Sequence, residues 1–267
     1  MQIGSAPGAT GWRKLARSTL VATGLMFGAY QPAHALIINA TYVGMTAAAQ
    51  AVVNNAISVY QTTFNDSITV NIQFHDMTSG LGASGSVTYT APYSSYRTLL
   101  AADQTTTNDA TALANLPTGS TSPVLSSTTM LIHSANARAV GFNAPGVAIN
   151  ISGFCTFTGD GCIGLNTGLT TTGNGTTTGS YSLLAVVEHE IDEVLGLGSA
   201  LSASSTATRG LPEDFFRYSA PGVRSFATNS STSQVCGSGT PSAYFSIDGG
   251  TTNLASLNNC NNGADYG

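Results

Sequence analysis

The sequence predicts a single domain of the α+β class, and three features of its pattern support this prediction. Residues 45–64 carry apolar side chains at helical spacing, and a strand-like alternation at 68–74 follows at once. Residues 182–195 form a second, more apolar helical stretch. Short strand-like runs and long loops rich in Gly, Ser and Thr fill the rest, with no internal repeat and no interdomain linker. Such an irregular order of helices and strands is typical of α+β domains.

The first 35 residues have the pattern of a secretory signal peptide. The positively charged residues at its start are Arg13, Lys14 and Arg17. An uncharged apolar stretch covers 19–30, and residues 33–35, Ala-His-Ala, fit the small-x-small cleavage pattern. We therefore expect a domain at 36–267 that begins at Leu36. An uncleaved membrane anchor is the less favoured alternative, because the apolar stretch is short for a membrane span.

Charge and composition exclude several classes of protein. Charged residues make up only 8% of the 267 residues, against 42% hydrophobic residues. Without the signal segment the chain has five Arg, no Lys and thirteen carboxylates, a formal net charge of −8. A basic nucleic-acid-binding surface is therefore excluded. No second apolar segment is long enough to span a membrane. We expect an exported monomer, extracellular or in the cell envelope.

The elements between the two helices follow from local patterns. Thr46 is a suitable cap for the first helix. Residues 78–86, rich in Gly and Ser, predict a loop, and 87–89 predict a short strand. Further short helices are predicted at 94–102 and 109–116, a loop at 117–127, and strands at 129–133, 137–142, 147–151 and 244–247.

Four cysteines remain in the exported chain, and an even number in such a chain is typical of disulfides. Of three connectivities we favour the two local pairs, Cys155–Cys162 and Cys236–Cys260, because short loops close most easily. A cysteine zinc site is the alternative, but the spacings are not CxxC.

The apolar helix at 182–195 holds the one concentration of charge in the chain. Its carboxylates are Glu188, Glu190, Asp192 and Glu193, and His189 lies among them. Like charges at i,i+3 and i,i+4 destabilise a helix, and no basic residue of the helix offsets them. A bound cation is the simplest solution, and pairing with Arg217 or Arg224 is the alternative.

Helix geometry supports a metal site. His189 and Glu193 are one turn apart on the same face, so one ion can lie between them. Glu190 lies about 100° further round the helix, within reach of a water on that ion. A metal-activated water beside a carboxylate is the basis of metal-assisted hydrolysis.

The segment 186–198, VVEHEIDEVLGLG, resembles the active-site helix of zincin metalloproteases and is closest to the metzincin form HExxHxxGxxH. Together with 212–226 and 244–253, it resembles a family of secreted bacterial metalloproteases with an HEIDEVLG helix. The resemblance implies a zincin-like domain with a small mixed sheet, an N-terminal helix, an active-site helix and a loop-rich C-terminal part.

By this resemblance, His189 is a zinc ligand and Glu190 is the general base. Glu193 stands where zincins have their second His, and a carboxylate is an acceptable zinc ligand. Ser199 stands where the third His would be, and no Met follows Met130 to form the metzincin Met-turn. The candidates for the third ligand are Glu213 and Asp214, with Asp265 a weaker one and a ligand beyond the end of the chain a further alternative.

The resulting prediction is a secreted Zn²⁺-dependent endopeptidase that acts on proteins or peptides. Tyr218 is a candidate for polarising the substrate carbonyl. His75 and His133 follow apolar stretches and are expected to be core-edge residues. The alternative is a non-catalytic cell-surface or adhesion module on a degenerate metalloprotease scaffold.

Overall fold

The structure is a computed structural model, and it describes residues 36–151, 155–173, 180–201, 208–226, 243–258 and 265–266. The described residues all belong to one compact unit. The expected signal peptide and the pair Cys236–Cys260 lie outside the described residues.

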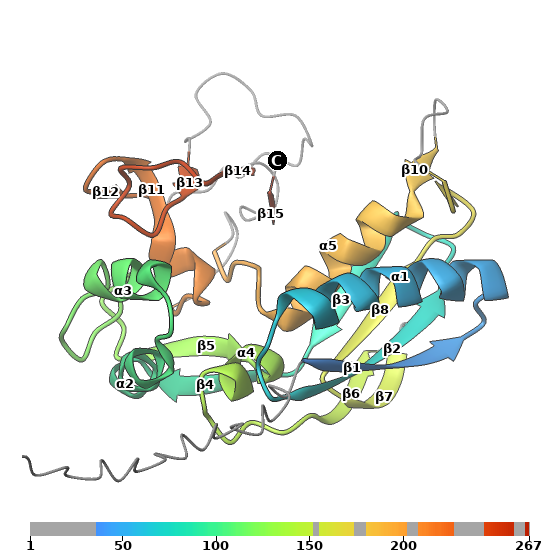
Figure 1. Cartoon of the computed structure of the whole chain (residues 1–267), viewed down its shortest axis with the longest axis horizontal. Coiled ribbons are helices and arrows are strands. Elements are labelled where there is room, and N and C mark those ends of the chain that lie inside the picture. The colour runs from blue at the N-terminus through green and yellow to red at the C-terminus, as the bar shows by residue number, and fades with distance from the viewer. Residues whose placement is uncertain are drawn as a thin grey trace, which may run out of the picture. The chain divides into compact units, whose positions relative to one another are not determined.

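The described part is a mixed α+β structure with five α-helices and several small sheets, as the sequence predicts (Figure 1). Its central sheet has four strands in the order β1 (Ile37–Val43), β2 (Thr69–Asp76), β8 (Gly161–Leu165) and β3 (Gly82–Ser86). The first three are parallel, and β3 runs antiparallel to β8 at the edge. The predicted small mixed sheet is therefore present.

Two helices cover one face of this sheet, α1 (Ala47–Thr63) and α5 (Leu183–Leu195) (Figure 1). The alternation in β2 buries every second side chain beneath them, namely Val70, Ile72 and Phe74. Thr46 caps α1 by accepting a hydrogen bond from the Ala49 amide, as its position predicts. Burial of this apolar face fixes α5 against the sheet, and with it the charged residues of α5.

The antiparallel pair β6 (Val147–Ile151) and β7 (Cys155–Gly159) packs beside β2. A disulfide joins Cys155 in β7 to Cys162 in β8, which confirms the first predicted pair. The two strands belong to different sheets, so the bond ties the hairpin to the central sheet.

A second apolar core lies in the rest of the chain. It is formed by the ribbon of β4 (Thr88–Pro92) and β5 (Thr129–His133), by three short helices, and by the C-terminal segments. The helices are α2 (Tyr93–Asp103), α3 (Thr107–Ala114) and α4 (Ser134–Ala139). The C-terminal elements are the 3-10 helix η1 (Glu213–Phe216) and an antiparallel sheet of β11 (Arg217–Ala220), β12 (Val223–Arg224), β13 (Ala243–Phe245), β14 (Ala255–Asn258) and β15 (Asp265–Tyr266). The small pair β9 (Thr170–Thr171) and β10 (Tyr181–Ser182) precedes α5.

Two local predictions were wrong. Residues 82–86 were predicted as loop but form β3, whose glycines allow close packing: a Cβ on Gly85 would lie 2.2 Å from Ile151 Cδ1. Residues 137–142 were predicted as a strand, but the helix α4 covers their first half. Tertiary polar contacts hold α4, because Arg138 and the Ser134 hydroxyl both donate to the buried carboxylate of Asp160.

None of the helices in the described part of the chain is both long and apolar enough to cross a membrane.

Candidate functional site

The candidate site is built on α5. The Ser182 hydroxyl caps its N-terminus by accepting from the Ala185 amide, and the helix ends at Gly196 with φ of 122°. This left-handed φ favours glycine. A row of apolar residues, Val187, Ile191 and Val194, is buried against the sheet. The opposite face is therefore presented outward.

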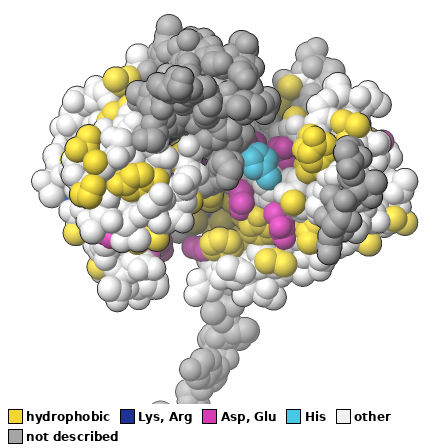
Figure 2. All heavy atoms as spheres, turned by 90° about the horizontal axis from the view of Figure 1, so that it is seen from above, with side chains coloured by type: hydrophobic (Ala, Val, Ile, Leu, Met, Phe, Trp, Pro, Cys, Tyr) yellow, Lys and Arg dark blue, Asp and Glu magenta, His cyan; other side chains and the backbone are white. Residues whose placement is uncertain are grey.

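His189 and Glu193 lie together on this outward face. The imidazole Nε2 is 3.7 Å from Glu193 Oε1, and the two side chains are 42% and 34% exposed. The view from above shows one histidine in a hollowed region of the surface, with acidic side chains beside it (Figure 2). The helical spacing thus brings an imidazole nitrogen and a carboxylate oxygen together in a position open to a ligand.

Glu190 lies on a different side of α5 and is only 5% exposed. Its carboxylate packs against the edge strand β3 at Gly82. A Cβ placed on Gly82 would lie 2.3 Å from Glu190 Oε1 and 2.7 Å from Val186 Cγ1. The absence of a side chain at Gly82 therefore makes the room in which the Glu190 carboxylate lies.

Two neighbouring elements hold the Glu193 end of α5. The Ser84 hydroxyl of β3 donates to Glu193 Oε2. The Nδ1 atom of His133, the last residue of β5, is 2.8 Å from the Glu193 carbonyl oxygen. Burial lowers the pKa of His133, against the opposing effect of this hydrogen bond, so the ring is neutral near pH 7. A neutral ring that donates from Nδ1 leaves Nε2 as an acceptor.

A small polar pocket of about 250 Å³ lies at this point. Its lining residues are Ser84, Ser86, Thr88, His133, Glu193, Leu197, Gly198, Ser199 and Leu211. From the sequence, His133 is expected to be a core-edge residue, and its contact with α5 is not predicted. No local signal marks that contact, because it joins residues 60 positions apart.

Asp192 is held from α1. The Tyr60 hydroxyl is 2.8 Å from both Asp192 Oδ1 and the Glu188 carbonyl oxygen. Burial raises the pKa of Asp192, while the hydrogen bond from Tyr60 and the neighbouring His189 oppose the shift. Tyr60 therefore links the two helices beside the candidate site.

Asp214 is fully buried, and its carboxylate is fully engaged in hydrogen bonds within the fold. Its carboxylate accepts hydrogen bonds from the Ser199 hydroxyl, from the Ala200 amide at 3.0 Å and from the Leu211 amide at 2.8 Å. Burial raises its pKa, and these bonds oppose the shift. Asp214 thus fixes the segment that follows α5.

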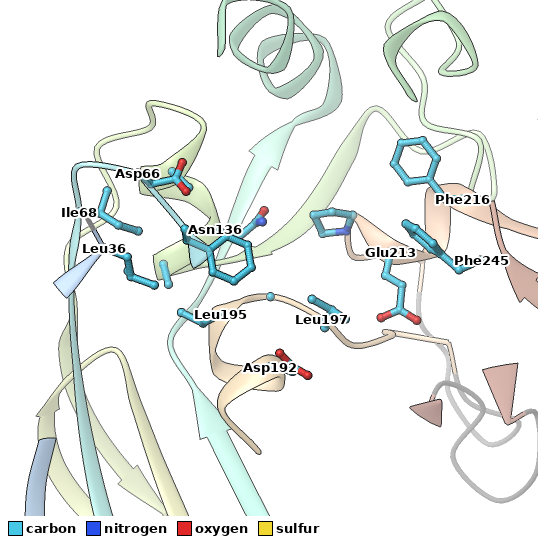
Figure 3. A pocket seen from close by; sticks show the side chains of 15 residues that line it. Leu36, Asp66, Ile68, Asn136, Asp192, Leu195, Leu197, Glu213, Phe216 and Phe245 are labelled. Atoms are coloured by element: carbon cyan, nitrogen blue, oxygen red, sulfur yellow. The ribbon is translucent and has the colours of Figure 1, made fainter. Parts of the chain in front are cut away.

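Glu213 is 5% exposed and lines a second, larger pocket, together with Asp192 and Leu197 (Figure 3). Both Glu213 and Asp214 are electrostatic neighbours of the fully buried Arg217. Their charges oppose the lowering of the Arg217 pKa by burial.

The other residues named from the sequence have clear positions. Tyr218 is buried, with the Arg224 guanidinium 4.7 Å above its ring, and Arg224 also donates to the Asn115 carbonyl. His75 is buried at the end of β2. The side chain of Asp265 lies outside the described residues.

The donors on α5 suit zinc, which binds imidazole nitrogen and carboxylate oxygen. The structure brings His189 and Glu193 together. Within the described ranges, three or more His, Cys, Asp or Glu side chains are nowhere grouped so that they could hold a metal ion. The third ligand therefore stays a prediction.

No protein-family model, characterised protein or solved structure matches this chain.

Proposed function

We propose that this protein is a secreted zinc-dependent peptidase of the zincin type. The observation that carries the proposal is the arrangement on α5. His189 Nε2 and Glu193 Oε1 lie 3.7 Å apart on its open face, while the Glu190 carboxylate is held against the edge strand at Gly82.

In this proposal His189 and Glu193 hold the metal. Of the two predicted third ligands, Glu213 is the better candidate, because the Asp214 carboxylate already accepts three hydrogen bonds. A zinc ion supplies Lewis acidity, which polarises a carbonyl group and makes water acidic enough to ionise near neutral pH.

Glu190 is the proposed general base. It would accept a proton from the attacking water and deliver it to the amide nitrogen that leaves. Its packing against β3 limits the positions that its carboxylate can adopt. Little conformational entropy is therefore lost when the carboxylate is oriented for the reaction.

Neighbouring residues also position the proposed metal ligand Glu193. Ser84 and His133 hold the Glu193 side chain and carbonyl, respectively. The strand β3 lies at the edge of its sheet, next to Glu190, so its outer backbone groups can pair with an extended peptide.

Glu190→Gln tests the function. The amide keeps the size of the side chain but cannot accept the proton, so we expect hydrolysis of a casein or quenched-peptide substrate to fall by about a hundredfold or more. Bound zinc should remain, because Glu190 is not a ligand in this proposal. Asp76→Asn, an exposed carboxylate of β2, is the matched control and should leave activity unchanged.

The second candidate is a non-catalytic surface module on a degenerate scaffold. The engagement of Asp214 favours it, because this removes one of the two predicted third ligands. In that case the wild type binds no zinc and hydrolyses no peptide, and Glu190→Gln changes stability alone.

A further inference from the structure

The larger pocket beside α5 has a volume of about 390 Å³, within the range of small-ligand sites. Its wall includes the C-terminal end of α5, the start of β1, the loop before β2, and η1 with β13 (Figure 3). Glu213, the better candidate for the third metal ligand, is at one side of it. The pocket therefore lies beside Glu213, the proposed third metal ligand.

The walls of this pocket are largely apolar. The apolar lining residues are Leu36, Phe64, Ile68, Ala135, Ala139, Leu195, Leu197, Pro212, Phe216 and Phe245. Phe64 and Leu197 remain 44% and 37% exposed. Such walls favour a hydrocarbon chain, whose removal from water is favourable.

Three carboxylates from different parts of the chain interrupt the apolar lining: Asp66, Asp192 and Glu213. Asp192 already accepts a hydrogen bond from Tyr60, and Glu213 has Arg217 as an electrostatic neighbour. None of the described residues that line the pocket is Lys, Arg or His. The pocket thus combines apolar walls with negative charge.

Asp66 differs from the other two carboxylates. It lies in the loop between α1 and β2, on the opposite side of the pocket from Glu213 (Figure 3). Its side chain makes no hydrogen bond or ion pair with the other described residues, and Asp103 lies near enough to add further negative potential. A cation that reached this point would be attracted by both charges.

We propose that this pocket takes a long basic side chain, arginine or lysine, of the peptide substrate. Such a side chain has a hydrocarbon stem and a charged head. The stem packs on Ile68, Leu195 and Leu197, and the head pairs with Asp66. This inference rests on the proposed function, and it adds the substrate class: peptides with a basic residue at one defined position relative to the cleaved bond.

The first test measures binding and needs no hydrolysis. n-Butylguanidinium is titrated into the full chain and followed by protein-observed NMR, beside the uncharged n-butylurea. We expect the guanidinium to bind at the resonances of Ile68 and Leu195 at least about tenfold more tightly than the urea, since charge-assisted pairing contributes about this factor. Asp66→Asn should remove the difference, and the control Asp76→Asn should keep it.

The second test measures specificity. Quenched peptides carry a single arginine, moved along an otherwise neutral sequence, and each has a partner with citrulline in its place. We expect one position at which kcat/KM for arginine exceeds that for citrulline by about tenfold, with loss of this preference in Asp66→Asn. Asp66→Lys, tolerable in a part-exposed loop, should shift the preference to glutamate at that position.

The outcomes separate the two proposals. Guanidinium binding that depends on Asp66, in a protein without peptidase activity, supports the pocket and overturns the proposed function. Hydrolysis without a preference for arginine, together with equal binding of guanidinium and urea, overturns the pocket and leaves the proposed function intact. A preference for large uncharged side chains also overturns it, because the carboxylates would then play no part.

Discussion

Gly82→Ala tests the contact on which the role of Glu190 depends. A methyl group at this position would lie 2.3 Å from Glu190 Oε1, 2.7 Å from Val186 Cγ1 and 3.0 Å from Glu190 Cδ. A Cβ atom is essentially never found within 3.0 Å of a heavy atom to which it is not bonded, so either β3 or the side chains of Glu190 and Val186 must move. The variant therefore perturbs the proposed base without changing its chemistry.

The size of the effect follows from the packing. Extra volume in a packed region costs about 1–3 kcal/mol of unfolding free energy. If Glu190 moves by as little as about 1 Å, catalysis should fall by up to about a hundredfold. We therefore expect lower stability in urea denaturation and a lower kcat at unchanged zinc content.

The matched control is Gly119→Ala. A Cβ on Gly119 meets no atom within 4 Å, and the same change in backbone entropy applies at both positions. Equal stability and equal activity of Gly82→Ala and Gly119→Ala would contradict the packing of Glu190 against β3.

Three further predictions concern the stability of the fold. Tyr60→Phe removes the hydroxyl that bonds Asp192, and should lower the unfolding free energy by about 1 kcal/mol; an unchanged denaturation midpoint would contradict this bond. Hydrogen bonds from Thr252 and Ser246 lower the pKa of Asp248 to about 2 from 3.8, so its stabilising effect is complete above pH 3.8 and is lost as the pH falls toward 2. Asp248→Asn should therefore flatten the dependence of Tm on pH in that window, and an unaltered profile would argue against these bonds. Replacing both Cys155 and Cys162 by Ala should cost about 2–3 kcal/mol, measured by thermal unfolding, for a short closed loop; a variant as stable as the wild type would show that the disulfide does not stabilise the fold.

Much of the fold follows from local pattern. Apolar spacing predicts α1 and α5 to within two residues of each end, and alternation predicts β2. The β3 strand is not predictable in this way, because glycine has a low strand propensity. Gly82 and Gly85 are needed there because Glu190 and Ile151 pack closely against them. The short helix α4 depends on Asp160, which is distant in sequence.

The candidate site is likewise predictable only in part from local pattern. The helical period alone places His189 beside Glu193 and puts Glu190 about 100° further round the helix. The positions of His133, Asp214 and Tyr60 depend on how separate segments meet, so no spacing in the sequence indicates them. Whether Glu213 completes the metal site remains a prediction for the same reason.

The most direct test of the account is the metal content of the purified full-length protein, measured by elemental analysis beside His189→Ala, Glu213→Gln and Glu190→Gln. We predict one zinc ion per chain in the wild type and in Glu190→Gln, and loss of zinc from His189→Ala and Glu213→Gln. If Glu213→Gln keeps its zinc while His189→Ala loses it, the third ligand is a residue other than Glu213. Absence of zinc from the wild type after purification in zinc-containing buffer would contradict the account and favour a non-catalytic module.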